Sequence, residues 1–191
     1  MSNPDTKPEQ EKTQRSSPEW SSARWWAKGL SSVLIAFLLT YLPIAWFAAR
    51  YRIWTDAVLG QNCLPYRTFL VDLKDRHIRR GDYIVFSSRQ MQPFYPNGTR
   101  VAKLVAGIPG DHILVNAQGV WVNEKYWGEL THVSTGARLW KMGRRATDYR
   151  RDERVPDGHF WMMGTKPRSY DSRYWGYITD EQVVGRAIPL W

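Results

Sequence analysis

The chain has 191 residues and a formal net charge of +9, from 27 Lys and Arg against 18 Asp and Glu. This length allows one ordinary domain with additions, and a content of 43% hydrophobic residues is enough to build a core. The single cysteine, Cys63, excludes an intramolecular disulfide and a Cys-based zinc site. The four histidines show no ligand spacing, so we expect neither a metal nor another cofactor.

The positive charge makes nucleic-acid binding the first alternative to consider. The basic residues are scattered, and the one denser run lies between Arg138 and Arg154. Acidic residues and glycine interrupt this run, and no recognition motif frames it. We therefore expect a solvated loop, or one that lies against anionic lipid, and no nucleic-acid partner.

The N-terminal quarter of the chain has the pattern of a tail followed by a membrane anchor. Residues 1–27 are rich in Ser, Pro, Glu and Lys and predict a disordered tail. Between Lys28 and Arg50 lie 21 uncharged residues, which is long enough to cross a membrane as a helix. A cleaved signal peptide would have a shorter apolar segment that begins closer to Met1. The sequence therefore predicts a retained transmembrane helix over residues 28–50.

The orientation of this helix follows from the positive charges that flank it. Five Lys and Arg precede the apolar segment, and Arg50 and Arg52 follow it. This small excess favours a cytoplasmic N-terminus.

After the anchor, the sequence changes to short apolar runs separated by Gly, Pro, Asn and Asp. Such spacing is typical of an all-β domain, and no stretch has the periodicity of a ten-residue amphipathic helix. We expect this domain to cover residues 51–191. The predicted strands are 66–72, 82–86, 99–106, 112–115, 120–123, 159–163 and 182–189.

Lys103 lies in the middle of a predicted strand, between apolar neighbours, and a Gly-Pro-Gly turn follows it. A lysine in this place either extends to solvent or is buried. Burial disfavours an ammonium group, and a neutral amine can act as a general base. Taken alone, an exposed strand lysine is the commoner case.

Five motifs favour the interpretation of Lys103 as a buried general base over that of an exposed strand lysine. Residues 103–111, KLVAGIPGD, resemble the pattern KRxxGxPGD of the signal peptidase I family. Residues 80–86 (RGDYIVF) and 155–164 (VPDGHFWMMG) resemble the family's RGDxVxF and VPxGxxFxMG. Residues 169–176 (SYDSRYWG) and 184–187 (VGRA) resemble its SxDSRYWG and VGRA, and all five occur in the family's order. One segment departs from the pattern, because residues 164–168 (GTKPR) replace the acidic GDNRxN.

The resemblance implies a fold and a location. The fold is mainly β: a signal-peptidase-like antiparallel β-sheet or barrel domain on a single N-terminal transmembrane helix. The protein would be a single-pass protein of the bacterial inner membrane. Residues 1–27 would then lie in the cytoplasm and residues 51–191, with the catalytic site, in the periplasm.

The nucleophile motif differs from that of the family. The family has SMxPT or, in the peptidases of conjugative plasmids, SxPxG, whereas this chain has QNCLPYR at residues 61–67. Cys63 stands where the family keeps Ser, and Pro65 resembles the conjugative-transfer branch (TraF type), which matures pilins. The alternative is a buried structural cysteine. A thiol is more acidic than a hydroxyl and therefore gives its proton to an amine more easily.

The resemblance assigns a role to each candidate residue. Cys63 would be the nucleophile and form a thioester, and Lys103 would be the general base. The backbone N–H of Cys63 would stabilise the oxyanion, with the side chain of Gln61 as second donor. Ser169 would orient Lys103.

The last two candidate residues are Asp171 and Arg173. We expect them to form an ion pair that fixes the loop of Ser169; an ordinary surface pair is the alternative.

The predicted function is that of a membrane-anchored endopeptidase that removes signal or leader peptides and matures a conjugative pilin. Attack of an amine on the thioester would also allow cyclisation of the pilin. The expected partners are a precursor protein or pilin substrate, membrane lipid and a conjugative transfer apparatus. The first alternative is a catalytically inactive anchored scaffold of such an apparatus. A second, a Ser–Lys autoprotease of the repressor type, fits neither the anchor nor the SYDSRYWG motif.

Overall fold

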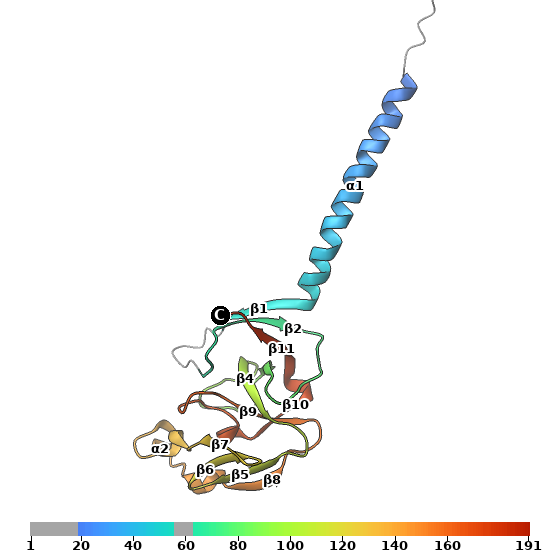
Figure 1. Ribbon diagram of the computed structural model, residues 1–191. Coiled ribbons are helices and arrows are strands. Elements are labelled where there is room, and N and C mark those ends of the chain that lie inside the picture. Colours follow the sequence, from blue (N-terminus) through green and yellow to red (C-terminus); the bar gives the residue numbers. More distant parts are fainter. Residues whose placement is uncertain (1–18, 56–62) are drawn as a thin grey trace, which may run out of the picture. The chain divides into compact units, whose positions relative to one another are not determined.

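The computed structural model describes residues 19–55 and 63–191 (Figure 1). The chain divides into two compact units, Met1–Trp46 and Phe47–Trp191. Helix α1 (Glu19–Arg50) contains a 27-residue candidate membrane span, Arg24–Arg50, within which an 18-residue stretch has a mean hydropathy of 2.0. At a rise of 1.5 Å per residue the span is about 40 Å long, which exceeds the hydrocarbon core of about 30 Å. By length and composition the helix is able to cross a membrane.

Helix α1 begins earlier than the sequence suggested. Residues 19–27, which we expected in a disordered tail, are helical, while residues 1–18 lie outside the described part. The segment EWSSARWWA contains neither Gly nor Pro, and adding a residue to an existing helix costs far less than starting one. The tail boundary predicted from composition, residue 27, therefore lies too far along the chain.

The second unit consists of two antiparallel sheets within the described residues. One sheet has the strand order β1-β2-β11-β3-β4-β9-β10 and the other β7-β6-β5-β8 (Figure 1). These sheets and the apolar N-terminal helix confirm the predicted fold class. The strands are β1 (Tyr51–Thr55), β2 (Thr68–Asp72), β3 (Tyr83–Ser87), β4 (Arg100–Gly107), β5 (His112–Asn116), β6 (Gly119–Val122), β7 (Lys125–Gly128), β8 (Arg151–Arg154), β9 (His159–Met163), β10 (Tyr177–Thr179) and β11 (Val183–Pro189). The helices are α2 (Arg138–Lys141) and α3 (Ser172–Trp175), with 3-10 turns at Thr131–Val133, Ala146–Tyr149 and Asp180–Gln182.

All seven predicted strands are present, with ends within two residues of the expected ones. Strands β1, β7, β8 and β10 were not predicted, and they are the four edge strands of the two sheets. An edge strand has a neighbour on one side only and commonly carries charged residues, which removes the apolar alternation that identifies an inner strand. Strand β8 (RDER) is the clearest case.

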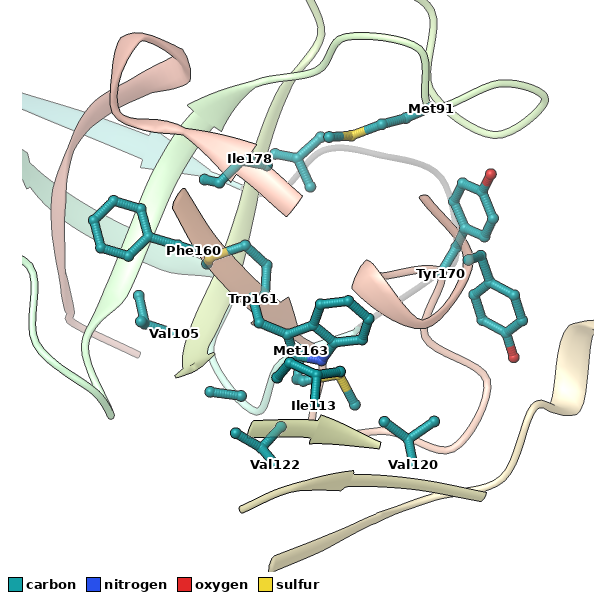
Figure 2. Packing of buried hydrophobic residues seen from close by; sticks show 14 of the residues in the cluster. Met91, Val105, Ile113, Val120, Val122, Phe160, Trp161, Met163, Tyr170 and Ile178 are labelled. Carbon is teal, nitrogen blue, oxygen red and sulfur yellow. The ribbon is translucent and has the colours of Figure 1, made fainter. Parts of the chain in front are cut away.

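Two apolar clusters form the core, and β4 contributes to both. In the larger cluster, Ile113 and Val122 of the smaller sheet pack near the fully buried Trp161 of the larger sheet (Figure 2). The smaller cluster contains Phe69 and Ala102. Successive side chains of a strand point to opposite faces, so Ala102 and the residue after it belong to different faces.

One ion pair joins two of the sequence motifs. Arg80 of the RGD segment binds the carboxylate of Asp111, which ends the GIPGD turn. The same carboxylate accepts a hydrogen bond from the backbone of Ile108 at 2.9 Å. This pairing fixes the turn that follows β4.

Candidate active site

Lys103 is buried in the middle of β4, with 1% of its surface exposed. It shares a strand face with Val101 and Val105, which belong to the larger core cluster. Its Nζ donates a hydrogen bond to Ser169 Oγ at 3.1 Å and lies 5.9 Å from the centre of the Tyr95 ring. Among the residues that the structure describes, Lys103 forms no ion pair with an acid.

Cys63 is also buried, with 3% of its surface exposed. Its carbonyl oxygen accepts hydrogen bonds from the backbone N–H of Thr165 at 2.8 Å and from the Thr165 hydroxyl at 3.3 Å. These bonds join the segment of Cys63 to the chain that follows β9.

Gly164 is the point where Cys63 and Ser169 come together. A Cβ atom at Gly164 would lie 2.0 Å from Ser169 Oγ and 3.0 Å from the Cys63 carbonyl oxygen. Both oxygens therefore lie within 3.0 Å of one point, and one of them is the hydrogen-bond partner of Lys103. The backbone carbonyl of Cys63, Ser169 and Lys103 thus belong to one cluster, with no side chain at residue 164 between that carbonyl and Ser169.

A buried ion pair supports this cluster from behind. Arg173 binds Asp171 through two parallel hydrogen bonds of 2.8 Å, and the two side chains are 1% and 0% exposed. The second oxygen of Asp171 also accepts from the backbone of Gly164 at 2.9 Å. Arg173 in turn donates to the carbonyl oxygen of Ser169 at 3.3 Å. The Asp171–Arg173 pair therefore fixes both Gly164 and Ser169, the two residues that pack against each other at this point.

Opposing effects set the protonation of Arg173. Burial by itself lowers the pKa of Arg173, but the charge and hydrogen bonds of Asp171 outweigh it, so that the pKa lies above its usual value. The guanidinium remains charged, and the pair persists as an ion pair.

A short segment between β7 and α2 clamps the Ser169 loop from outside. The carbonyl oxygen of Glu129 accepts a hydrogen bond from Arg173 at 3.0 Å, and Thr131 Oγ1 donates to the carbonyl oxygen of Pro167 at 2.8 Å. The buried His132 places Nε2 2.9 Å from the carbonyl oxygen of Arg168. Burial lowers the pKa of His132, so its neutral imidazole donates this bond through Nε2.

Five of the six predicted site residues lie in the described part and come together, either directly or through Gly164. Gln61, the predicted second oxyanion donor, lies outside the described residues. The ion pair of Asp171 and Arg173 is buried, not a surface pair. Among the described residues, no three His, Cys, Asp or Glu side chains are grouped to hold a metal ion.

Sequence reasoning missed the residues that support the site. Gly164 ends the VPDGHFWMMG motif and Thr165 is the first residue that departs from the family pattern, but nothing in the sequence indicated that they meet Cys63. His132 lies outside all five motifs, so no pattern in the sequence indicated its contact with the Ser169 loop.

The comparisons with known proteins agree on one family. A family model described as "Signal peptidase, peptidase S26" matches residues 24–191. Signal peptidase I of Pseudomonas fluorescens is 31% identical over 143 residues, which cover 59% of this chain and 49% of that protein. Signal peptidase I of Leptolyngbya laminosa is 28% identical over 176 residues, which cover 84% and 74%. The chain spans about half the length of several of the curated relatives that it matches.

A solved structure of a signal peptidase I from Enterococcus faecalis V583 is 27% identical to this chain. The alignment covers 57% of this chain and 95% of that one, with a TM-score of 0.35. The family model extends over α1, over the strand of Lys103 and over the loop of Ser169. The chain belongs to the signal peptidase family, peptidase S26.

Proposed function

We propose that this protein is a membrane-anchored endopeptidase that removes signal or leader peptides from precursor proteins. The observation that carries the proposal is the hydrogen bond between the buried Lys103 and Ser169, beside the backbone of Cys63. Family membership supplies the reaction class, since the relatives are named signal peptidase I.

In this proposal, Cys63 is the nucleophile and Lys103 the general base. The amine of Lys103 takes the thiol proton while its hydrogen bond to Ser169 holds it in place. The sulfur then attacks the scissile carbonyl, and the peptide bond breaks as the new N-terminus leaves with a proton. Water hydrolyses the thioester and restores the thiol. The backbone N–H of Cys63 and the side chain of Gln61 are the proposed oxyanion donors.

The ion pair of Asp171 and Arg173 supports these roles because it fixes the segments around Lys103. Asp171 holds Gly164, and Arg173 holds the Ser169 carbonyl, so that the atoms around Lys103 Nζ are fixed before a substrate arrives. Preorganisation of this kind lowers the barrier because no reorientation is needed in the transition state.

Pilin maturation in a conjugative transfer apparatus is the narrower proposal. It rests on the QNCLPYR segment, where Pro65 follows Cys63 by two positions. The anchor would lie in the bacterial inner membrane, with residues 1–27 in the cytoplasm and the domain from residue 51 in the periplasm. Helix α1 has the length and composition that this topology requires.

An inactive anchored scaffold is the second candidate function, and one observation favours it. Only 3% of Cys63 is exposed, whereas a nucleophile must meet its substrate. In this alternative, Cys63 is a small buried apolar residue and Lys103 a structural one.

Cleavage of a precursor by the full chain in detergent distinguishes the two. We expect the native protein to cut a precursor after a small residue, and Cys63→Ala and Lys103→Ala to leave it intact. Cys63→Ser, which restores the nucleophile of the family, should keep part of the activity. Equal cleavage by the native protein and both alanine variants would refute the proposal. Intact-mass spectrometry also detects cyclisation, because a circular product is lighter than the linear one by one water.

A further inference from the structure

A polar cavity with aromatic walls lies beside the candidate active site. Its volume is about 360 Å³, within the range of pockets that bind small groups or side chains. It is lined in part by the loop before β4, by α2 and its following turn, and by the residues around α3. The residues that matter for its chemistry are Gln92, Arg144, Tyr149, Tyr170 and Tyr174.

The charge in this cavity is positive. Arg144 is its one charged lining residue, and among the described residues it forms no ion pair. Its guanidinium lies 5.8 Å from the centre of the Tyr149 ring. The nearest acid in sequence, Asp148, is engaged elsewhere, because its carboxylate accepts a hydrogen bond from the backbone of Arg145 at 3.0 Å. The cavity therefore contains a guanidinium, that of Arg144, which has no acidic partner among the described residues.

The tyrosines give this cation a fixed frame. The Tyr170 hydroxyl donates to the carbonyl oxygen of Gln92 at 2.9 Å, and the Tyr174 hydroxyl accepts from the backbone of His132 at 3.0 Å. Burial raises the pKa of Tyr170 to about 12, so its hydroxyl is protonated at neutral pH. Tyr149 is 5% exposed and contacts Arg144 through its hydroxyl. Arg144 and Tyr149 together form a polar end suited to a carboxylate.

The cavity shares a wall with the candidate active site. Tyr170 follows Ser169 directly in the chain, and its ring centre lies 6.0 Å from that of Tyr95. The centre of the Tyr95 ring in turn lies 5.9 Å from Lys103 Nζ. Because Tyr170 lines the cavity and is the chain neighbour of Ser169, the cavity adjoins the loop of the candidate site.

We propose that this cavity is a specificity pocket that takes the carboxylate side chain of a precursor residue, Glu or Asp, a few positions from the bond that is cut. The proposal rests on the proposed peptidase function and adds a substrate preference to it. The carboxylate meets the guanidinium of Arg144 and the hydroxyl of Tyr149, while the neighbouring rings pack against its methylene groups.

Two adjacent arginines provide a matched test. Both side chains are exposed, but Arg144 lines the cavity, whereas the guanidinium of Arg145 lies over Trp140, 5.3 Å from the ring centre. A series of precursor peptides carries one Glu, or Gln in its place, at successive positions around the cleavage site. We measure KM and kcat for the full-length native protein and for Arg144→Gln, Arg145→Gln and Tyr149→Phe.

We expect Glu to lower KM by about tenfold relative to Gln at one or two adjacent positions, with kcat unchanged. Arg144→Gln should remove this preference and Tyr149→Phe should weaken it, while Arg145→Gln keeps it. Cleavage of all peptides without a preference for Glu would overturn the pocket and leave the peptidase function intact. Equal losses in the two arginine variants would also overturn it, because they indicate general attraction of charge. Failure of the native protein to cut any peptide would instead refute the peptidase function on which the pocket depends.

Discussion

Replacement of Gly164 by Ala tests whether close packing holds Ser169 against Lys103. The backbone at Gly164 does not have a positive φ, so Ala is compatible with its conformation. The effect of the substitution therefore comes from the added methyl group alone. That group would lie 2.0 Å from Ser169 Oγ and 2.4 Å from Ser169 Cβ, which no packed structure accepts.

The magnitude follows from these distances. An ordinary contact requires Ser169 to move by about 1 Å or more, and its hydrogen bond to Lys103 Nζ is already 3.1 Å long. Overpacking of a core costs about 1–3 kcal/mol, and a buried polar group left without its partner costs about 1–3 kcal/mol more. We expect Gly164→Ala to lower the free energy of unfolding by about 2–6 kcal/mol and to abolish most peptidase activity.

A second glycine provides the control. A Cβ at Gly185 of β11 would lie 2.3 Å from the carbonyl oxygen of Asp72, in a part of the larger sheet without contact to Ser169. Gly185→Ala should therefore destabilise the fold while the molecules that remain folded keep their kcat. Thermal unfolding in detergent and precursor cleavage are measured for both variants.

The double variant Gly164→Ala/Ser169→Gly completes the experiment. Removal of the Ser169 side chain relieves both short contacts, so it should restore part of the stability without restoring activity. Native stability and native kcat in Gly164→Ala would refute the reasoning, because Ser169 would then have room to move without consequence for Lys103.

Two further predictions concern the supports of the site. Arg173→Met leaves Asp171 buried without its partner and should cost about 3–5 kcal/mol of stability, as read by denaturant unfolding, while Arg173→Met/Asp171→Leu should cost less; an equal or larger loss in the double variant would contradict this. Burial lowers the pKa of His132 below 6.5, so below pH 6.5 the unfolded state binds a proton that the folded state refuses, and stability falls as the pH falls. His132→Phe keeps an aromatic ring between Phe94 and Tyr174 and should flatten this part of the stability profile; an unchanged profile would show that His132 does not titrate there.

The edge strands show where sequence patterns lose their power. Each inner strand of this domain has a neighbouring strand on both sides and at least one buried face, so its sequence is alternating or continuously apolar. All of the inner strands were predicted. Strand β8 consists of Arg151, Asp152, Glu153 and Arg154, which have no apolar alternation, and it is extended because its backbone pairs with β5. Its conformation is a property of the assembled sheet and not of its own residues.

The site divides in a similar way. The motifs alone pointed to Cys63, Lys103, Ser169, Asp171 and Arg173, because each stands at a fixed place in a pattern. The sequence did not indicate that Lys103 is buried: an exposed strand lysine and a buried one have the same neighbours in the chain. Burial was decided by the larger core cluster, which covers the face of β4 on which Lys103 lies.

The sequence by itself determined the apolar segment that is long enough to cross a membrane, the β-rich domain and the residues that carry the proposed chemistry, because hydrophobicity, turn residues and motif spacing are local properties. Tertiary structure alone decided that the absent side chain of Gly164 lets Ser169 meet Lys103, that residues 129–132 clamp the loop, and that Arg144 reaches a cavity beside it. These are contacts between segments tens of residues apart, and only the packing of the two sheets sets their distances.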